Sequence, residues 1–228
     1  MTNPIKNLTA AGLASALFLF AAEPVRFDDT VRNDFFSGLR GNAEALSRGM
    51  KTAEAALAGN SKHAEALVWH GIGLFVASGQ AFQRGDRETG MTMYTKAFAE
   101  MDRAVELEPG NIGVRIPRGS ALMAAARSMS GNPMAAGFLD RALADYLSAY
   151  ELQKGALDQM GTHPRGELLF GLADTYSRQG NAAKADEFFT LIATHLKDTP
   201  YAKRAAIWQE TRQPLPPAQA NCIGCHVK

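Results

Sequence analysis

The residues best suited to chemistry lie together near one end of the sequence. The stretch NCIGCHVK, residues 221–228, contains both cysteines of the chain, Cys222 and Cys225, and His226 follows the second cysteine directly. C-x-x-C-H spacing lets two thiols add to the two vinyl groups of one porphyrin while the histidine reaches the iron. The motif therefore predicts one covalent c-type haem, with Cys222 and Cys225 as thioether links and His226 as the proximal iron ligand.

Other uses of the two cysteines stay open from the sequence. A plain Cys222–Cys225 disulfide would suit an oxidising compartment. A zinc clip would need about four ligands, so distant histidines would have to complete it. A thioredoxin-like redox pair is disfavoured, because no βαβ pattern surrounds the motif. All of these alternatives predict a colourless protein, whereas haem gives the protein a colour.

The motif does not fix the sixth ligand of the iron. His163 lies in a loop between predicted helices and could meet the end of the chain, and Met123 could act from a predicted groove. His70 occupies an apolar stripe and is expected in the core, while His63 and His195 fall at helix ends. A methionine ligand would raise the reduction potential and a histidine ligand would lower it. A five-coordinate or water-bound iron is the remaining alternative.

Residues 30–212 carry an almost unbroken helical pattern. No run of alternating β-branched residues predicts a strand, and Gly and Pro residues divide the pattern into segments. Pro117 is expected to kink or delay the helix that contains it. The fold class is therefore all-α, and a hydrophobic content of 46% permits a sizeable core. The predicted helices span residues 30–39, 42–58, 63–83, 87–108, 112–129, 134–153, 164–178, 181–197 and 201–212.

The two ends of the chain differ from this helical part, residues 23–212. Residues 1–22 contain Lys6 and then an uncharged apolar stretch, which resembles a secretory signal peptide. A buried helix or an uncleaved membrane anchor are the alternatives for this segment. At the other end, PLPP (214–217) cannot continue a helix, so residues 213–228 are expected to form a Pro-rich tail. We expect a periplasmic or otherwise exported protein with the motif on this tail.

Several helical segments resemble the tetratricopeptide repeat (TPR) family. MDRAVELEPGN (101–111) resembles the end of a repeat, and HAEALVWHGIGLF (63–75) and GVRIPRGSALMAAAR (113–127) resemble first helices. The fullest match is GLADTYSRQGNAAKADEFF (171–189), where the residues at family positions are Leu172, Ala173, Tyr176, Gly180, Ala185 and Phe189. The resemblance implies a helix-turn-helix repeat solenoid whose paired helices touch at small residues, here Gly71, Gly119 and Ala173.

The repeat spacing departs from the family. Units that start at Ala64, Ile112 and Gly166 are about 48 and about 54 positions apart, longer than the 34-residue repeat. Two extra turns in each helix would lengthen a unit and keep each apolar stripe on its face. In TPR proteins the first helices line a concave groove. The resemblance therefore implies a partner groove, with ordinary helix contacts as the alternative, at Ile72, Phe75, Ile116 and Met123.

Composition and missing motifs narrow the function. The 24 basic and 23 acidic residues nearly cancel, which disfavours a nucleic-acid surface and a polybasic membrane patch. No phosphate loop, G-x-S-x-G or H-E-x-x-H is present, and Asp28, Asp29 and Asp34 are expected to cap a helix rather than bind a cation. We expect electron transfer or haem-bearing docking to a redox protein or membrane complex. The alternatives are a non-haem periplasmic scaffold and a peroxidase-type enzyme.

Overall fold

A computed structural model describes residues 26–216 of the chain. This part of the chain is helical, and none of its residues lies in a β-strand. The predicted signal segment, residues 1–22, and the motif from Cys222 to His226 lie outside the described residues. The elements are α1 (Phe27–Leu39), α2 (Ala43–Gly59), α3 (Ala64–Gln83), α4 (Arg87–Leu107), α5 (Ile112–Ser128), α6 (Met134–Gln153), the 3₁₀ helix η1 (Lys154–Gln159), α7 (Thr162–Arg178), α8 (Ala182–His195) and α9 (Pro200–Thr211).

The predicted all-α class is confirmed, and each predicted helix has a counterpart within three residues at either end. The helix that contains Pro117 begins at Ile112 and continues to Ser128, so the proline does not delay its start. Helix α1 starts earlier than predicted, which places Asp28 and Asp29 in its first turn. The capping role expected for them is wrong, because Arg26 occupies the N-cap position and makes no side-chain cap bond.

Short polar side chains fix where most helices begin. The Asp86 side chain accepts a hydrogen bond from the backbone N–H of Thr89 at 3.1 Å, and the Asn181 side chain accepts one from Lys184 at 3.1 Å. Hydrogen bonds from the Thr89 side chain and backbone lower the pKa of Asp86. Gly85, with φ of 81°, precedes Asp86 and adopts a backbone conformation that favours glycine. The Gly-Asp and Gly-Asn breaks in the sequence therefore end one helix and cap the next.

Consecutive helices pack closely at small residues. A Cβ atom added to Gly71 in α3 would lie 2.8 Å from the carbonyl oxygen of Ala97 and 2.8 Å from Met101 in α4. A Cβ atom added to Gly119 in α5 would lie 3.2 Å from the ring of Tyr146 in α6. Side chains larger than glycine would push these helices apart, so the predicted close approach at both positions is confirmed.

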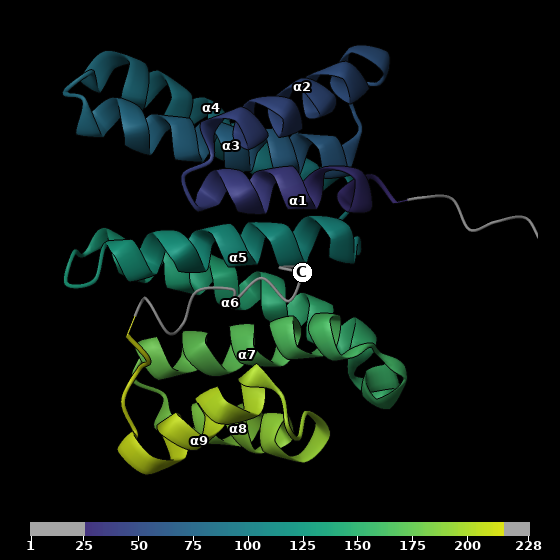
Figure 1. The fold of residues 1–228 in the computed structure, drawn as a ribbon, viewed down its shortest axis with the longest axis vertical. Coiled ribbons are helices and arrows are strands. Elements are labelled where there is room, and N and C mark those ends of the chain that lie inside the picture. The colour runs from purple at the N-terminus through teal and green to yellow at the C-terminus, as the bar shows by residue number, and fades with distance from the viewer. Residues whose placement is uncertain (1–25, 217–228) are drawn as a thin grey trace, which may run out of the picture.

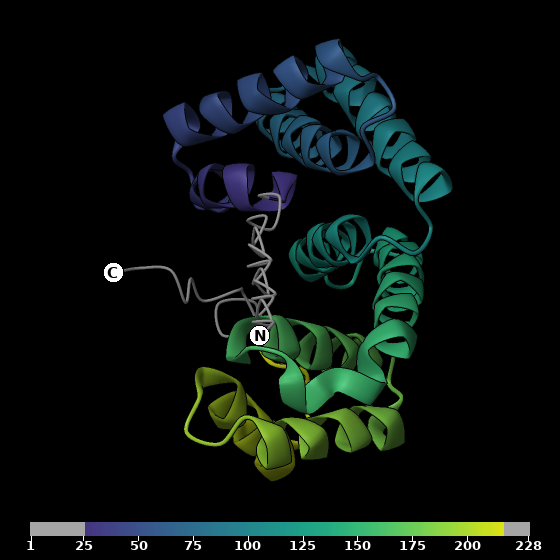
Figure 2. The same ribbon diagram turned by 90° about the vertical axis from the view of Figure 1, so that its right-hand side faces the viewer.

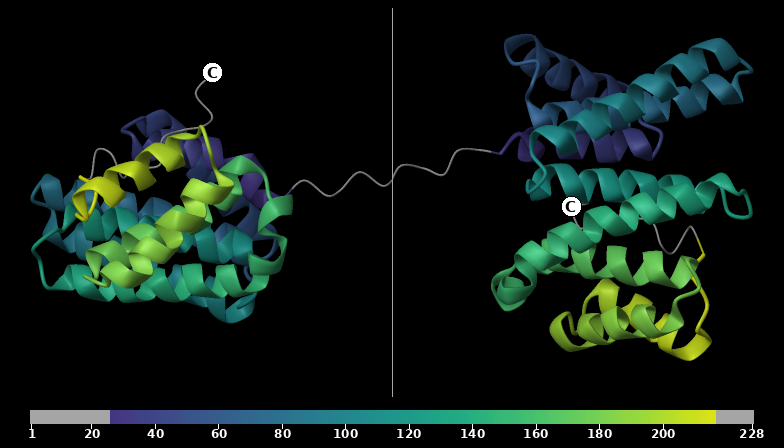
Figure 3. Two further views of the ribbon diagram at one scale, coloured as in Figure 1. Left: turned by 90° about the horizontal axis from the view of Figure 1, so that it is seen from below. Right: turned by 180° about the vertical axis from the view of Figure 1, so that it is seen from behind.

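The helices lie across the long axis of the molecule and follow one another from α1–α4 at one end to α7–α9 at the other (Figure 1). Their path is C-shaped in Figure 2, where α4 and α6 form the back and α1, α5 and α7 lie nearer the open side. The view from behind in Figure 3 shows α4 and α6 on the opposite face from α1. The fold thus directs one face of α1, α5 and α7 toward a common interior.

Two hydrophobic clusters hold the described residues together. One centres on α1–α4 and contains Trp69, and the other centres on α5–α9 and contains Trp208, so both tryptophans are core residues. Phe75 and Phe98 pack against both clusters. Their rings meet edge to face at 5.6 Å, and Phe98 stacks on Phe138 of α6 at 5.7 Å. These aromatic rings therefore join the two halves of the structure.

A buried ion-pair network links α5 to α6. Asp145 is fully buried, and its carboxylate accepts hydrogen bonds from Arg118 Nε at 2.7 Å and from Arg115 Nη1 at 2.8 Å. Arg118 also donates to Asp102 of α4 at 2.9 Å. Because an uncompensated buried charge is very costly, this network fixes how α4, α5 and α6 meet.

Candidate functional site

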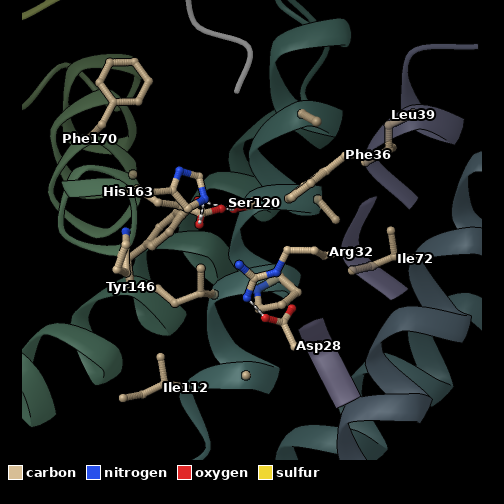
Figure 4. Close-up of a pocket in the computed structure, with 18 of the residues that line it drawn as sticks. Asp28, Arg32, Phe36, Leu39, Ile72, Ile112, Ser120, Tyr146, His163 and Phe170 are labelled. Carbon is tan, nitrogen blue, oxygen red and sulfur yellow. Dashed lines mark hydrogen bonds and ion pairs between the residues drawn. The ribbon is translucent and has the colours of Figure 1, made fainter. Parts of the chain in front are cut away.

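A cavity of about 450 Å³ lies between the inner faces of α1, α3, α5 and α7, with contributions from α6 and α9. Small-molecule and cofactor sites are typically about 300–1,000 Å³, so its size suits a cofactor rather than a single water or ion. Figure 4 shows the labelled side chains that surround it. The cavity is the candidate functional site of the described residues.

One wall of the cavity is a polar network around His163. His163 lies in the first turn of α7 and Glu167 lies one turn later, so they share a face. His163 Nε2 is 3.5 Å from Glu167 Oε2, and its Nδ1 is 3.4 Å from the Tyr201 hydroxyl. Ser120 Oγ donates to Glu167 Oε1 at 3.1 Å and is 3.1 Å from the Tyr146 hydroxyl. A carboxylate beside an imidazole orients the ring, as the outer-shell partners of metal-binding histidines do.

The lining of the cavity is rich in arginine. Its charged residues include two carboxylates, on Asp28 and Glu167. Arg32 forms an ion pair with Asp28, and Arg127 donates to the fully buried Asp174 at 2.8 Å. The lining also contains five guanidinium groups, on Arg26, Arg32, Arg40, Arg127 and Arg204. Three of these arginines already pair with carboxylates, Arg26 with Glu65 at 3.8 Å, Arg32 with Asp28 and Arg127 with Asp174, so most of this positive charge is balanced.

Arg32 and His163 face each other across the cavity. In Figure 4 they extend toward its centre from α1 and α7, on opposite sides. Burial lowers the pKa of Arg32, and the negative charge of Glu167 opposes this effect. An arginine keeps its proton in proteins, so Arg32 stays ion-paired with Asp28 and, at 3.0 Å, with Asp29 at neutral pH.

Apolar side chains complete the site. Trp69 and Ile72 come from α3, Ile116 from α5 and Phe170 from α7. Of these, Trp69, Ile72 and Phe170 are buried, and Arg204 lies over the Phe170 ring at 4.6 Å. An apolar cavity with a few convergent polar groups is the usual form of a cofactor site.

The sequence-predicted groove residues divide into two groups. Ile72 and Ile116 line the cavity. Phe75 belongs to the aromatic contacts between the two clusters, and Met123 is fully buried, with its sulfur accepting a hydrogen bond from the Thr175 hydroxyl at 3.0 Å. Among the two candidates for a sixth ligand, the structure places His163 at the cavity and Met123 in the core.

The other three histidines of residues 26–216 lie where the sequence suggests. His70 is buried, with Nδ1 2.5 Å from Glu100 Oε2. His63 is the N-cap residue of α3, and His195 is the last residue of α8, where its Nδ1 lies 2.8 Å from Asp158. The lining of the cavity includes His163 and none of these three.

The start of the C-terminal tail is fixed beside α7. Helix α9 ends at Thr211, before PLPP, as predicted. Leu215 is buried in the second core cluster, and its carbonyl oxygen accepts a hydrogen bond from Arg178 Nη2 at 2.6 Å. Arg178 is the last residue of α7, which is the helix that carries His163 in its first turn. The tail therefore leaves the described structure at one end of a helix that lines the cavity.

Sequence reasoning missed Arg32, Glu167, Ser120 and Tyr146. One signal was present, because His163 and Glu167 are four residues apart and so share a helix face. The other three side chains come from α1, α5 and α6. No local spacing shows that these helices meet.

Residues 26–216 lack two further features. No helix of this range is both long and apolar enough to cross a membrane. No group of three or more His, Cys, Asp or Glu side chains in the same range is placed to hold a metal ion.

No protein-family model, no curated protein and no solved structure matches the chain.

Proposed function

We propose that this chain is an exported TPR-like protein that carries one covalent c-type haem and acts in electron transfer or as a haem-bearing docking subunit. The observation that carries the proposal is the C-x-x-C-H motif, because its cysteines are the two cysteines of the chain. The signal-like segment at residues 1–22 supports export, since c-type haem is attached on the exported side. The expected partner is a redox protein or a membrane complex.

The TPR-like part of the proposal concerns the helix pairs α3/α4, α5/α6 and α7/α8. It is supported by the order of these helices and by the tight contacts at Gly71 and Gly119. The C-shaped path in Figure 2 is compatible with stacked helix pairs. In this proposal the pairs are lengthened repeats, and the outer faces of the stack are available to the partner.

Attachment joins the tail to the porphyrin without net oxidation or reduction. Cys222 and Cys225 would hold the haem through two thioether bonds, each made by adding the S–H of one cysteine across one vinyl double bond. His226 would supply an iron ligand. When bound, the haem supplies a one-electron couple, and the protein supplies the ligands, the charges and the exclusion of water around it.

The chain should be purified after expression with its own N-terminal segment in a host that attaches c-type haem. We expect a coloured protein whose spectrum changes reversibly in a one-electron titration. The colour should survive extraction with acidified acetone, because the haem is covalent. A colourless, folded helical protein would overturn the proposal and favour the scaffold with a Cys222–Cys225 disulfide or a metal clip.

A further inference from the structure

We propose that the C-terminal tail folds back along α7 and seats its haem in the cavity between α1, α3, α5 and α7, where His163 is the sixth iron ligand. This inference rests on the proposed function, because it requires the haem on Cys222 and Cys225. It names an occupant for the cavity, residues 217–228 with the attached cofactor, and it identifies the iron ligand that the motif leaves open.

The first support is the reach of the tail. Its start is fixed at Leu215, which the last residue of α7 holds through a hydrogen bond. His163 lies fifteen positions before Arg178, which is about 22 Å along a helix at about 1.5 Å per residue. Cys222 lies seven positions after Leu215, and His226 lies eleven, so extended chain at about 3.3 Å per residue covers about 23 and about 36 Å. The motif can therefore reach His163 without moving the helices.

The second support is charge. Haem carries two propionate groups, and the lining of the cavity includes five arginines, three of which already pair with carboxylates. Arg40 lines the cavity and is exposed, and the described residues provide no ion-pair partner for it. The other segment that could occupy the cavity, residues 1–25, carries no comparable negative charge, since Glu23 is its single acidic residue. Charge therefore favours the haem-bearing tail over the N-terminal segment.

The third support is the chemistry of the wall that His163 occupies. Its imidazole is about five-sixths buried, with 17% of the side chain exposed, and its Nε2 lies beside the Glu167 carboxylate. Nδ1 is therefore the nitrogen that would bind the iron, in place of its 3.4 Å contact with the Tyr201 hydroxyl. Ser120 donates to the other oxygen of that carboxylate and so holds it in position. Glu167 is therefore a positioning residue, because carboxylates in contact with a metal-binding histidine fix its ring and raise its basicity. Trp69, Ile72 and Ile116 supply the apolar surface against which a porphyrin can pack.

The test uses the full haem-loaded chain and compares His163→Ala with His195→Ala. We expect the wild type and His195→Ala to show a six-coordinate, low-spin ferric spectrum. His163→Ala should lose the low-spin signal, and added imidazole should restore it. His163→Met should stay six-coordinate and show a higher reduction potential, because a Met/His pair raises it. An unchanged low-spin spectrum in His163→Ala would overturn the inference.

A second pair of variants tests the cavity itself without removing a ligand. Ala124 lines the cavity and is exposed, so Ala124→Trp fills space on the α5 wall without entering the core. We expect it to abolish the low-spin signal, whereas Ala136→Trp, at an exposed position of α6 outside the cavity lining, should not. A normal spectrum in Ala124→Trp would contradict the placement of the haem.

These experiments distinguish a failure of the proposed function from a failure of the haem placement. A wild-type protein without covalent haem would refute the proposed function. If the wild type carries haem and its low-spin signal is unchanged in both His163→Ala and Ala124→Trp, only the placement of the haem in the cavity is refuted. A low-spin signal that disappears on dilution would show ligation by a second copy. A signal lost on removal of residues 1–25 from the haem-loaded protein would show that this segment completes the site. Either the dilution effect or this loss would overturn the inference.

Discussion

Replacement of Asp145 by alanine is expected to lower the free energy of unfolding by about 3–5 kcal/mol, the usual loss when one partner of a buried ion pair is removed. Asp145 is fully buried between Arg115 and Arg118. Without its carboxylate, two arginines of α5 lose their shared acceptor, and water reaches Arg118 poorly because only 9% of its side chain is exposed. Urea unfolding followed by far-UV circular dichroism measures the change.

Asp140 provides a matched control on the same helix. It is exposed on α6 and accepts a hydrogen bond from Gln179. Asp140→Ala should change the free energy of unfolding by no more than about 0.5 kcal/mol, as is typical of surface substitutions. Equal effects of the two replacements would show that the network around Asp145 does not hold α5 and α6 together.

The double variant Cys222→Ala/Cys225→Ala is expected to lose all covalently attached haem. The physical reason is that each thioether needs a thiol sulfur, and the chain has no cysteine besides these two. Haem-dependent staining after denaturing electrophoresis should fall from a strong band to background. Each single variant retains one sulfur and can form one thioether at most.

The fold of this double variant should persist, because the two core clusters consist of residues before Pro216. Its far-UV circular dichroism spectrum should match that of the wild type. His63→Ala is the ligand-type control, since His63 caps α3 and its side chain is not part of the cavity lining. Covalent haem that survives in the double variant would exclude attachment at the motif.

The helices could be predicted because their signals are local. Gly85 and Asp86 end α3 and cap α4 through bonds that span only a few residues. The stripe of Ala97, Met101 and Ala104 marks the buried face of α4, and all three residues are buried. Such patterns fix helix bounds without any knowledge of tertiary structure. The start of α1 was misplaced because Arg26 makes no side-chain cap bond that marks it.

The cavity could not be predicted, because it depends on how distant helices meet. Arg32 and Glu167 are far apart in the sequence but come from α1 and α7, which both line it. Met123 illustrates the same limit. The TPR resemblance assigned it to a groove, whereas the hydroxyl of Thr175 in α7 contacts its sulfur. The helical face that turns inward depends on side-chain packing between α5 and α7, which a single periodic stripe does not specify.

The most direct test of the central claim is the mass of one peptide. Trypsin cleaves after Arg212, so digestion of the denatured protein from a haem-attaching host releases residues 213–228, which contain Cys222, Cys225 and His226. The account predicts that this peptide carries the added mass of one haem. A peptide with free thiols, or one lighter by two hydrogens because of a Cys222–Cys225 disulfide, would contradict it.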